Sequence, residues 1–369
     1  MCGVMKKHSN SIFLLTLCLI VIQYQGVFGQ TVPEYRIKAS QILNGNDEAI
    51  GFYNPSRIVA IGEYLIIIDD ANDDQVLVFD IKSHKFINAI GKIGRGPGEF
   101  LDPWNIFISK TESQEKFCIY GLRLRKISCF DLENVVKKSS HLPLYSVMLG
   151  KEIGMPLRIN GMPTAKEFII TGIFPESYRF LLADSSGNVT RRSDKVDHQK
   201  EKEPLNVFQH AYTVVPVSNL EGTKIALGYF YSNLIEIYSS GDGTMLTSIR
   251  GIGDHDFYKP LFSTRKTPYG LTMAQGGDTR LAYIDINAGE NYIYALYSGR
   301  RRKDKGSGQS NIVHVVSWDG ELKSVLHLDT DVRDCDVSSL NGRKKLFCIN
   351  NSRVNPSILT YEIADLKDN

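Results

Sequence analysis

The sequence predicts an all-β protein, a six-bladed β-propeller in which each blade is a sheet of four strands. Three observations lead to this prediction. Paired apolar runs recur about every 50 residues, no stretch keeps a 3.6-residue hydrophobic period, and 18 Tyr with 17 Phe favour strands over helices. Regular repeats of this length are typical of propellers. They replace the two or three domains that a length of 369 residues would otherwise suggest.

The composition excludes several other classes of protein. Apolar residues make up 42% of the chain, and 43 basic residues nearly balance 41 acidic ones. These values exclude a disordered chain and a collagen-like fibre, and six Cys are too few for a cysteine-stapled mini-protein. The net charge of +2 lacks the concentrated basic field of a nucleic-acid binder, so we expect no nucleic-acid partner.

The first element along the chain is a signal peptide, expected over residues 1–29. Lys6 and Lys7 precede an apolar run over Ile12–Ile22, which as a helix is about 16 Å long, roughly half of a bilayer core. A modest and a small residue stand at the −3 and −1 positions before Gln30, which suits cleavage there. The expected product is one domain over residues 30–369, secreted or periplasmic. Cys18 lacks the small neighbours of a lipoprotein signal, so a lipid anchor is the lesser alternative.

Six pairs of strands come next, as short runs rich in Ile, Val, Phe and Tyr between Gly, Asn and Asp. The first runs start 52, 51, 57, 67 and 54 residues apart, and each pair leaves room for two flanking strands. The pairs are Leu65–Asp69 with Val76–Asp80, Phe117–Tyr120 with Ile127–Asp131, Phe168–Thr171 with Phe180–Asp184, Ile225–Tyr229 with Leu234–Tyr238, Tyr292–Leu296 with Ile312–Asp319, and Leu346–Asn350 with Ile358–Ile363.

Three copies of the motif F-x-x-P, starting at Phe52, Phe100 and Phe257, mark the passage from one blade to the next. We expect the glycines before them to supply positive φ, the Phe to plug the space between blades, and the Pro to open the innermost strand of the next blade. The residues assigned to these structural linkers are Gly94, Gly96, Gly98, Phe100, Pro103, Phe257 and Pro260.

These motifs carry a family resemblance. The segment Ile90–Ile108 contains G-R-G-P-G-E-F-L-D-P before an Ile-rich strand, and Asp69–Asp80 has the form D-x-x-N followed by V-F-D. Both look like the linker and hairpin of NHL-type blades. The G-R-G-P-G-E-F form behind a signal peptide resembles the secreted bacterial proteins of the TolB-like six-bladed β-propeller group. The resemblance implies six blades, and its strong motifs cover the first two.

The ring is expected to close through the N-terminus of the mature chain. After Ile358–Ile363 almost no residues remain for an outer strand, whereas Tyr35–Ile42 alternates and precedes the first blade. We predict that this N-terminal strand completes the last blade and leaves no free sheet edge.

No local motif carries chemistry. The glycine loop has Glu99 where a dinucleotide fingerprint needs Gly, and no helix follows it. Read as a calcium loop from Asp70, the acidic cluster has Gln75 and Ile81 where Gly and Glu are needed. The eight His form no zinc pattern, and G-x-S-x-G is absent. We therefore assign no catalytic residue, metal or cofactor, although several blades together could still form a site.

Four of the six Cys lie opposite one another across two predicted hairpins. Counting outward from the Asn341-Gly342 turn pairs Cys335 with Cys348, and Cys118 and Cys129 flank the turn of the second blade in the same way. Opposed residues in antiparallel strands are within disulfide reach, and an oxidising compartment permits the bonds. Two disulfides and four buried thiols remain equal alternatives.

The turns inside the strand pairs lie at the same end of each blade as the glycine linkers, and we expect a ligand on that face. Arg forks and aromatic planes there suit carboxylate- or sugar-bearing partners and protein hot spots. The basic tract Arg300–Lys305 is best read as a solvated hairpin tip, with contact to an anionic glycan, lipid or partner as the alternative. The face candidates are Arg95, Arg123, Arg125, Phe174, Tyr178, Tyr231, Arg300, Arg301, Arg302 and Arg353.

The leading functional hypothesis is a monomeric binding or interaction module whose partner is an envelope protein or a glycan. The alternative is a propeller enzyme, a lyase or hydrolase acting on a sugar, lactone or peptide at the central funnel. Fold alone does not decide between them. Three or more titratable side chains at the funnel favour the enzyme, whereas a wall of Ile, Val and Ser favours the binder.

Overall fold

The structure is a computed structural model that describes residues 32–45, 51–111, 114–163, 166–198, 203–252, 257, 259–268, 270–352 and 355–363. The signal peptide expected over residues 1–29 lies outside the described residues. From Glu34 on, the chain forms one compact unit. No helix in the described ranges has the length and apolar character needed to span a membrane.

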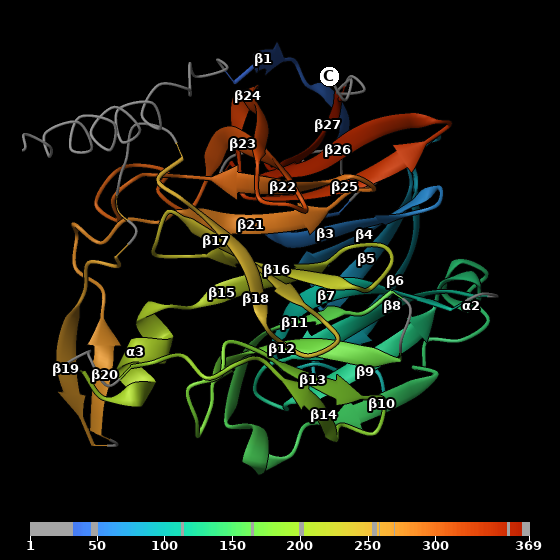
Figure 1. Cartoon of the computed structure of the whole chain (residues 1–369). Helices are drawn as coiled ribbons and strands as arrows, with labels where there is room; N and C mark the ends of the chain where they lie inside the picture. The colour runs from blue at the N-terminus through green and yellow to red at the C-terminus, as the bar shows by residue number, and fades with distance from the viewer. Residues whose placement is uncertain are drawn as a thin grey trace, which may run out of the picture. The chain divides into compact units, whose positions relative to one another are not determined.

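Six sheets of four antiparallel strands form the blades of a β-propeller (Figure 1). Every predicted strand pair is the second and third strand of one sheet. From inner to outer strand, the blades are β3 (Pro55–Ile61), β4 (Tyr64–Asp69), β5 (Asp74–Asp80), β6 (Phe86–Lys92); β7 (Pro103–Thr111), β8 (Gln114–Gly121), β9 (Lys126–Asp131), β10 (Tyr145–Met148); β11 (Met155–Gly161), β12 (Glu167–Ile173), β13 (Leu181–Asp184), β14 (Val189–Arg192); β15 (Val214–Ser218), β16 (Lys224–Tyr229), β17 (Leu234–Ser239), β18 (Met245–Arg250); β21 (Tyr283–Ala288), β22 (Tyr292–Tyr297), β23 (Ser310–Ser317), β24 (Leu322–Val332); and β25 (Asp334–Leu340), β26 (Arg343–Asn350), β27 (Ser357–Glu362), β2 (Ser40–Asn44).

The first strands of the six blades lie side by side in a closed ring around a central channel. Because neighbouring strands in a blade are antiparallel, the links between blades and the turns between second and third strands share one end of the ring, which we call the linker face. The turns between first and second strands lie at the other end, the hairpin face. In Figure 1 the linker face carries α3 (Leu205–Ala211), and α2 (Leu132–Val136) lies on the opposite side.

The N-terminal segment closes the ring, in two pieces. The predicted single strand Tyr35–Ile42 is wrong in detail. β1 (Glu34–Ile37) pairs in parallel with β24 of the fifth blade, and only β2 completes the sixth blade against β27. The chain changes sheets at Ala39, whose N–H lies 3.2 Å from both carboxylate oxygens of Asp329. The N-terminal and C-terminal strands thus meet in the sixth blade and close the ring, as expected, with β2 as the outer strand of that blade.

A hairpin of β19 (Ser263–Thr267) and β20 (Gly270–Ala274) is inserted between the fourth and fifth blades, and in Figure 1 it lies beside α3. It overturns the expectation that Pro260 opens an innermost strand, because β21 starts only at Tyr283. Pro55 and Pro103 do open innermost strands.

The core lies in layers between neighbouring blades, and alternate side chains of each strand pack into the layers on its two sides. In β3, Val59 and Ile61 pack toward the second blade, whereas Ile58 and Ala60 pack toward the sixth. β3 is therefore apolar on both faces, and along the channel the innermost strands present aliphatic and polar side chains together. This arrangement makes the channel the place where polar groups from all six blades meet.

Candidate functional site

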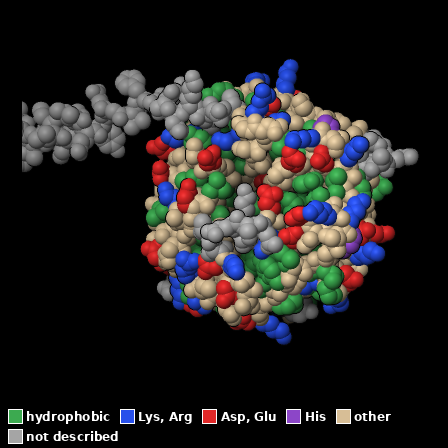
Figure 2. Space-filling model, turned by 90° about the vertical axis from the view of Figure 1, so that its right-hand side faces the viewer, with side chains coloured by type: hydrophobic (Ala, Val, Ile, Leu, Met, Phe, Trp, Pro, Cys, Tyr) green, Lys and Arg blue, Asp and Glu red, His purple; other side chains and the backbone are tan. Residues whose placement is uncertain are grey.

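A cavity of about 460 Å³ opens from the channel on the hairpin face. All six innermost strands contribute to it near their ends. Its aliphatic wall includes Val59, Ile61, Ile108 and Val217. Its polar lining is Glu115, Asn160, Ser218, Asn287, Glu290, Asp336, Ser338, Ser339 and Lys344. Figure 2 looks onto this face, where hydrophobic and acidic side chains lie around the middle. The volume is within the range of small-molecule sites. We call this space the channel cavity.

A second, narrower cavity of about 50 Å³ lies deeper in the channel, toward the linker face. It shares Val59, Ile106, Asn160 and Asn287 with the channel cavity, so the two are successive parts of one channel. Its charged and polar lining is Arg57, Asn105, Arg158, Asn160, Asp285, Asn287 and Asp334. We call this part the narrow end.

Backbone bulges direct these polar side chains into the channel. The register between first and second strands shifts immediately before Arg57, Asn105, Arg158 and Asp285, at equivalent positions in four blades. A bulge adds a residue to one strand and re-aims the next side chain. The same local device therefore places an ionic or amide group at the narrow end from four different blades.

Three carboxylates along the channel, of which Asp334 and Asp336 are buried, bond to the unpaired edges of the innermost strands. Asp334 accepts from the N–H of Ile58 at 2.9 Å, and Asp336 accepts from the N–H of Ala60 at 2.7 Å. Asp285 accepts from the N–H of Cys335 at 3.2 Å. Innermost strands have no strand partner on the channel side, and buried N–H groups need an acceptor. These acids therefore join neighbouring blades.

Burial shifts the ionisation of these groups. It raises the pKa of Asp336 to about 7, with the nearby charge of Asp334 adding to the rise. Burial also raises the pKa of Asp285 and of Asp334, which interact with each other. On the opposite side, burial and then the charge of Arg57 lower the pKa of Arg158 to about 9. Burial in the low-dielectric interior disfavours the charged form of each group.

The face candidates on the linker face do not form one site. Arg125 donates to the backbone carbonyls of Leu149, Gly150 and Gly154, which braces the link to the third blade. Arg123 is exposed and pairs with Asp102, and Phe174 is 3% exposed in the core. Arg95 is exposed in its linker, and Tyr178 lies under the cations of Arg192 and Lys195. Arg353 lies outside the described residues.

One face candidate, Tyr231, lies near the channel, and Arg302 lies near Tyr231. Tyr231 is 7% exposed and accepts from the side-chain amide of Gln275. Burial raises its pKa, and the charges of Arg302 and Arg158 oppose that rise. Tyr231 thus lies close enough to Arg302 and to Arg158 at the narrow end to interact with the charges of both.

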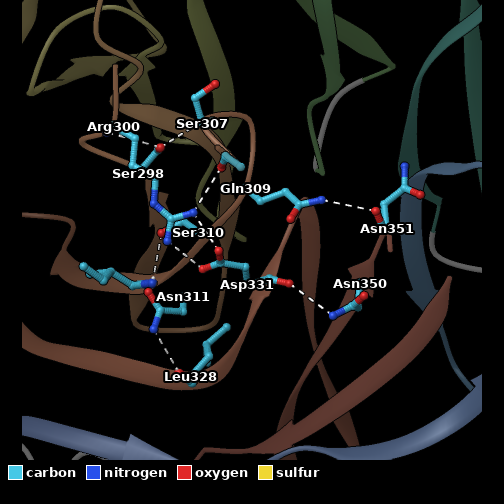
Figure 3. A network of polar contacts seen from close by, with 12 residues as sticks. Ser298, Arg300, Ser307, Gln309, Ser310, Asn311, Leu328, Asp331, Asn350 and Asn351 are labelled. Carbon is cyan, nitrogen blue, oxygen red and sulfur yellow. Dashed lines mark hydrogen bonds and ion pairs between the residues drawn. The ribbon is translucent and has the colours of Figure 1, made fainter. Parts of the chain in front are cut away.

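The base of the basic tract is anchored, as Figure 3 shows. Arg300 forms a bidentate pair with Asp331, at 2.6 and 2.7 Å. Arg301 pairs with Asp304 at 3.5 Å, and Lys303 pairs with Asp278. Gln309 donates to the carbonyl of Asn351 at 3.3 Å, which ties the tract to the sixth blade. The tract between β22 and β23 is therefore largely neutralised by its own acids, and its exposed cations include Arg302.

The glycine loop is built around a lysine. Lys126 is 7% exposed and donates through Nζ to the carbonyls of Gly96 and Glu99, at 2.9 and 3.0 Å. Carbonyls directed at a cation cannot cradle a phosphate. Gly98 has a φ of +74°, whereas neither Gly94 nor Gly96 adopts positive φ. A Cβ on Gly94 would lie 2.0 Å from Oε2 of Glu99, and one on Gly96 would lie 3.0 Å from it. The expectation of positive φ thus fails at Gly94 and Gly96, which leave room for the side chain of Glu99.

Phe100 and Phe257 occupy different surroundings. Phe100 is 0% exposed and packs with Phe130 between the first two blades. Phe257 is half-buried, with the guanidinium of Arg280 over its ring at 5.6 Å.

The acidic cluster also has a structural role. Asp69 is fully buried and accepts from the N–H groups of Tyr53 at 2.6 Å and Ala71 at 2.9 Å. Asn72 donates to the carbonyl of Gly51 at 3.0 Å. These bonds fasten the hairpin of the first blade to the F-x-x-P linker that precedes it.

The four cysteines form two cross-strand disulfides in the structure. Cys118 joins Cys129 and Cys335 joins Cys348, with Cα–Cα distances of 4.0 and 4.1 Å. Each pair is directly opposed in its sheet. Cys335 also lines the narrow end of the channel.

Sequence reasoning missed the residues of the channel, but a signal for three of them was present. The innermost strands of the first three blades open with Pro, one variable residue and then Arg57, Asn105 or Arg158. This P-x-[RN] repeat coincides with the bulges that turn these side chains inward. The acids at Asp285, Asp334 and Asp336 have no comparable motif.

The comparisons with known proteins agree with this architecture. The family model described as TolB-like 6-blade propeller-like matches residues 36–340, which is most of the chain. No curated protein sequence matches.

Solved structures are similar at low sequence identity. A putative exported protein from Bacteroides fragilis NCTC 9343 is 12% identical, with a TM-score of 0.52 over 90% of this chain and 99% of that chain. Raptor from Chaetomium thermophilum is 11% identical, with a TM-score of 0.50 over 88% of this chain, and the chain spans 29% of its length. The Cps50 (Swd1) β-propeller domain of Myceliophteria thermophila is 11% identical, with a TM-score of 0.47 over 87% of this chain and 99% of that chain. These likenesses concern the fold alone. On the match of the family model, the chain belongs to the TolB-like six-bladed β-propeller family.

Proposed function

We propose that this propeller is a non-enzymatic binding module, which takes a small ligand or the end of a chain into the channel cavity. The observation that carries the proposal is the cavity of about 460 Å³ at the hairpin face, formed jointly by all six blades. Pockets of this kind, apolar with a few converging polar groups, are the usual form of ligand sites. The cavity lies opposite the face on which the sequence placed a ligand.

The lining indicates what kind of molecule would fit. Val59, Ile61, Ile108 and Val217 offer an aliphatic wall. Ser338 and the amides of Asn160 and Asn287 offer hydrogen bonds, so the ligand would combine an apolar body with polar groups. A glycan end or an exposed segment of an envelope protein would meet this description as well as a free metabolite.

An extracytoplasmic location accords with this role. The two disulfides require an oxidising compartment to persist. The similar protein from Bacteroides fragilis is named as a putative exported protein. Cell fractionation with N-terminal sequencing tests the location: the predicted result is an envelope or secreted protein starting at Gln30, and an uncleaved cytoplasmic protein would contradict it.

The alternative function, a propeller enzyme, is favoured by four titratable side chains in the cavity lining, Glu115, Glu290, Asp336 and Lys344, although the same lining also carries the aliphatic and Ser residues expected of a binder. The most specific of the four is Asp336. Asp336 lies in the channel cavity, and burial raises the pKa of its carboxyl to about 7. A carboxylic acid that titrates near neutral pH is suited to general acid or base catalysis. Its Oδ2 already accepts from the N–H of Ala60, however, and the bonds of the other two channel acids are also structural. We therefore place binding first.

A pair of tryptophan substitutions tests the binding proposal. Ser338 is half-buried in the wall of the cavity, so Ser338→Trp should fill its mouth. Ser185 is exposed in the β13–β14 turn on the same face but away from the cavity, so Ser185→Trp is the matched control. The three proteins are screened against sugars, amino acids, short carboxylates and peptides. We expect at least one of these classes to raise the melting temperature of the wild type and of Ser185→Trp, but not that of Ser338→Trp. A class that acts equally on all three proteins would contradict the cavity as the site.

A further inference from the structure

Two arginines line the narrow end of the channel, and a third lies near one of them. Arg57 on β3 and Arg158 on β11 belong to the lining, whereas Arg333 lies in the link between β24 and β25. Arg57 is close enough to interact with both of the others: after burial, its charge is the next cause that lowers the pKa of Arg158 and of Arg333. Like charges held close together in a low-dielectric site are stabilised when an anion lies between them.

Arg158 is the least satisfied of the three. Its Nη1 atom is buried and has no hydrogen-bond partner among the described residues. Its guanidinium stacks over the ring of Trp104 at 5.0 Å, and the indole N–H of Trp104 donates to the carbonyl of Leu157 at 2.8 Å. The stacking fixes the plane of the guanidinium, while a buried donor without an acceptor is costly. Within the described part of the chain, this N–H in the channel is thus held in place without an acceptor.

The neighbouring acids do not supply that acceptor. Asp334 accepts from the N–H of Ile58 and lies 3.6 Å from Arg57. Asp285 accepts from the N–H of Cys335 and from the side-chain amide of Asn287. Burial raises the pKa of both carboxyls, so each holds its negative charge beside the arginines less readily than an exposed carboxyl would.

We propose that the narrow end binds the carboxylate of a ligand whose apolar body lies in the channel cavity. The narrow end measures about 50 Å³, room for a head group and not for a whole ligand. Four shared lining residues make it continuous with the cavity of about 460 Å³. Two N–H groups of a guanidinium match the two oxygens of a carboxylate. The inference rests on the proposed binding function and names its ligand class, an organic acid or an acid-bearing chain end.

The test compares molecules that differ only in the head group. The intact protein is titrated by isothermal calorimetry with hexanoate, hexan-1-ol and inorganic phosphate. Hexanoate and hexan-1-ol share an apolar body and differ in charge, whereas phosphate is an anion without an apolar body. We expect the wild type to bind hexanoate at least about tenfold more tightly than hexan-1-ol. Arg158→Gln should lose that preference. Arg123→Gln, which removes an exposed arginine of the linker face, should keep it.

Each other outcome points to a different error. Equal binding of hexanoate and hexan-1-ol by the wild type would overturn the carboxylate site, and sensitivity to Ser338→Trp would then still support the cavity. Hexanoate binding that Arg158→Gln abolishes and Ser338→Trp leaves intact would overturn the placement of the body in the cavity. Tighter binding of phosphate than of hexanoate would overturn the organic acid. If Arg158→Gln does not fold, as judged by near-ultraviolet circular dichroism, Arg158→Lys replaces it, with the same expected loss of preference because Lys lacks the planar fork.

Discussion

Replacing the buried Asp336 by Asn should stabilise the protein at alkaline pH and change little in acid. Folding raises the pKa of this carboxyl from 3.8 to about 7, chiefly through burial. The unfolded chain therefore gives up this proton more readily than the folded chain. The stability linked to this group is fully present below pH 3.8 and is lost as the pH rises through about 7.

The magnitude follows from that difference in pKa. At 1.36 kcal/mol for each pH unit, the ionised carboxylate costs the folded state up to about 4 kcal/mol above pH 7. In Asp336→Asn the amide oxygen can still accept from the N–H of Ala60, the bond that Asp336 makes at 2.7 Å, but the side chain never ionises. The variant should therefore exceed the wild type by about 2–4 kcal/mol at pH 8 and match it near pH 4.

Urea unfolding of both proteins between pH 4 and pH 8.5 measures this difference directly. Glu290→Gln removes an exposed carboxyl from the same cavity and serves as the control, with a stability difference that stays below about 1 kcal/mol throughout. A difference between Asp336→Asn and the wild type that is the same at both ends of the pH range would refute the reasoning. So would a variant less stable than the wild type at pH 8.

Two further predictions concern the scaffold around the channel. Phe100→Ala should lower the free energy of unfolding by about 3–5 kcal/mol, because its ring is 0% exposed between two blades. The control Phe86→Ala, at a ring that is 41% exposed, should cost less than about 1 kcal/mol. Similar losses for the two variants in urea unfolding would argue against Phe100 as a residue that fills the space between blades. Replacing Cys335 and Cys348 together by Ser should cost about 2–4 kcal/mol, and non-reducing peptide mapping that found free thiols at all four bridge positions would contradict both disulfides.

The fold could be predicted from the sequence because its signals are local. Each strand pair is visible in the sequence as two short apolar runs separated by a turn. The runs are the second and third strands of a blade, where burial on both faces requires continuous hydrophobic residues. The first and fourth strands are more polar and were only inferred from the room left for them. The division of the N-terminal strand at Ala39 depends on Asp329, 290 residues away, and no local pattern contains that contact.

The site was harder to predict because a channel is formed by six strands that are far apart in sequence. An arginine in a turn gives no sign of whether its guanidinium is free. Arg125 is occupied by three carbonyls and Arg300 by Asp331, whereas the buried Nη1 of Arg158 has no partner among the residues that the structure describes. The P-x-[RN] repeat could have indicated the narrow end, since it recurs where a bulge must turn a polar side chain inward. The acids of the sixth blade could not have been found in this way, because they follow no repeated pattern.

The most direct test of the central claim, that the channel holds a ligand with its acid group at the narrow end, is a crystal structure of the intact protein soaked with 6-bromohexanoate. The account predicts an anomalous bromine peak within the channel cavity and the carboxylate within hydrogen-bond distance of Nη1 of Arg158. Bromine peaks confined to the outer surface, with Arg158 still unpaired, would contradict it.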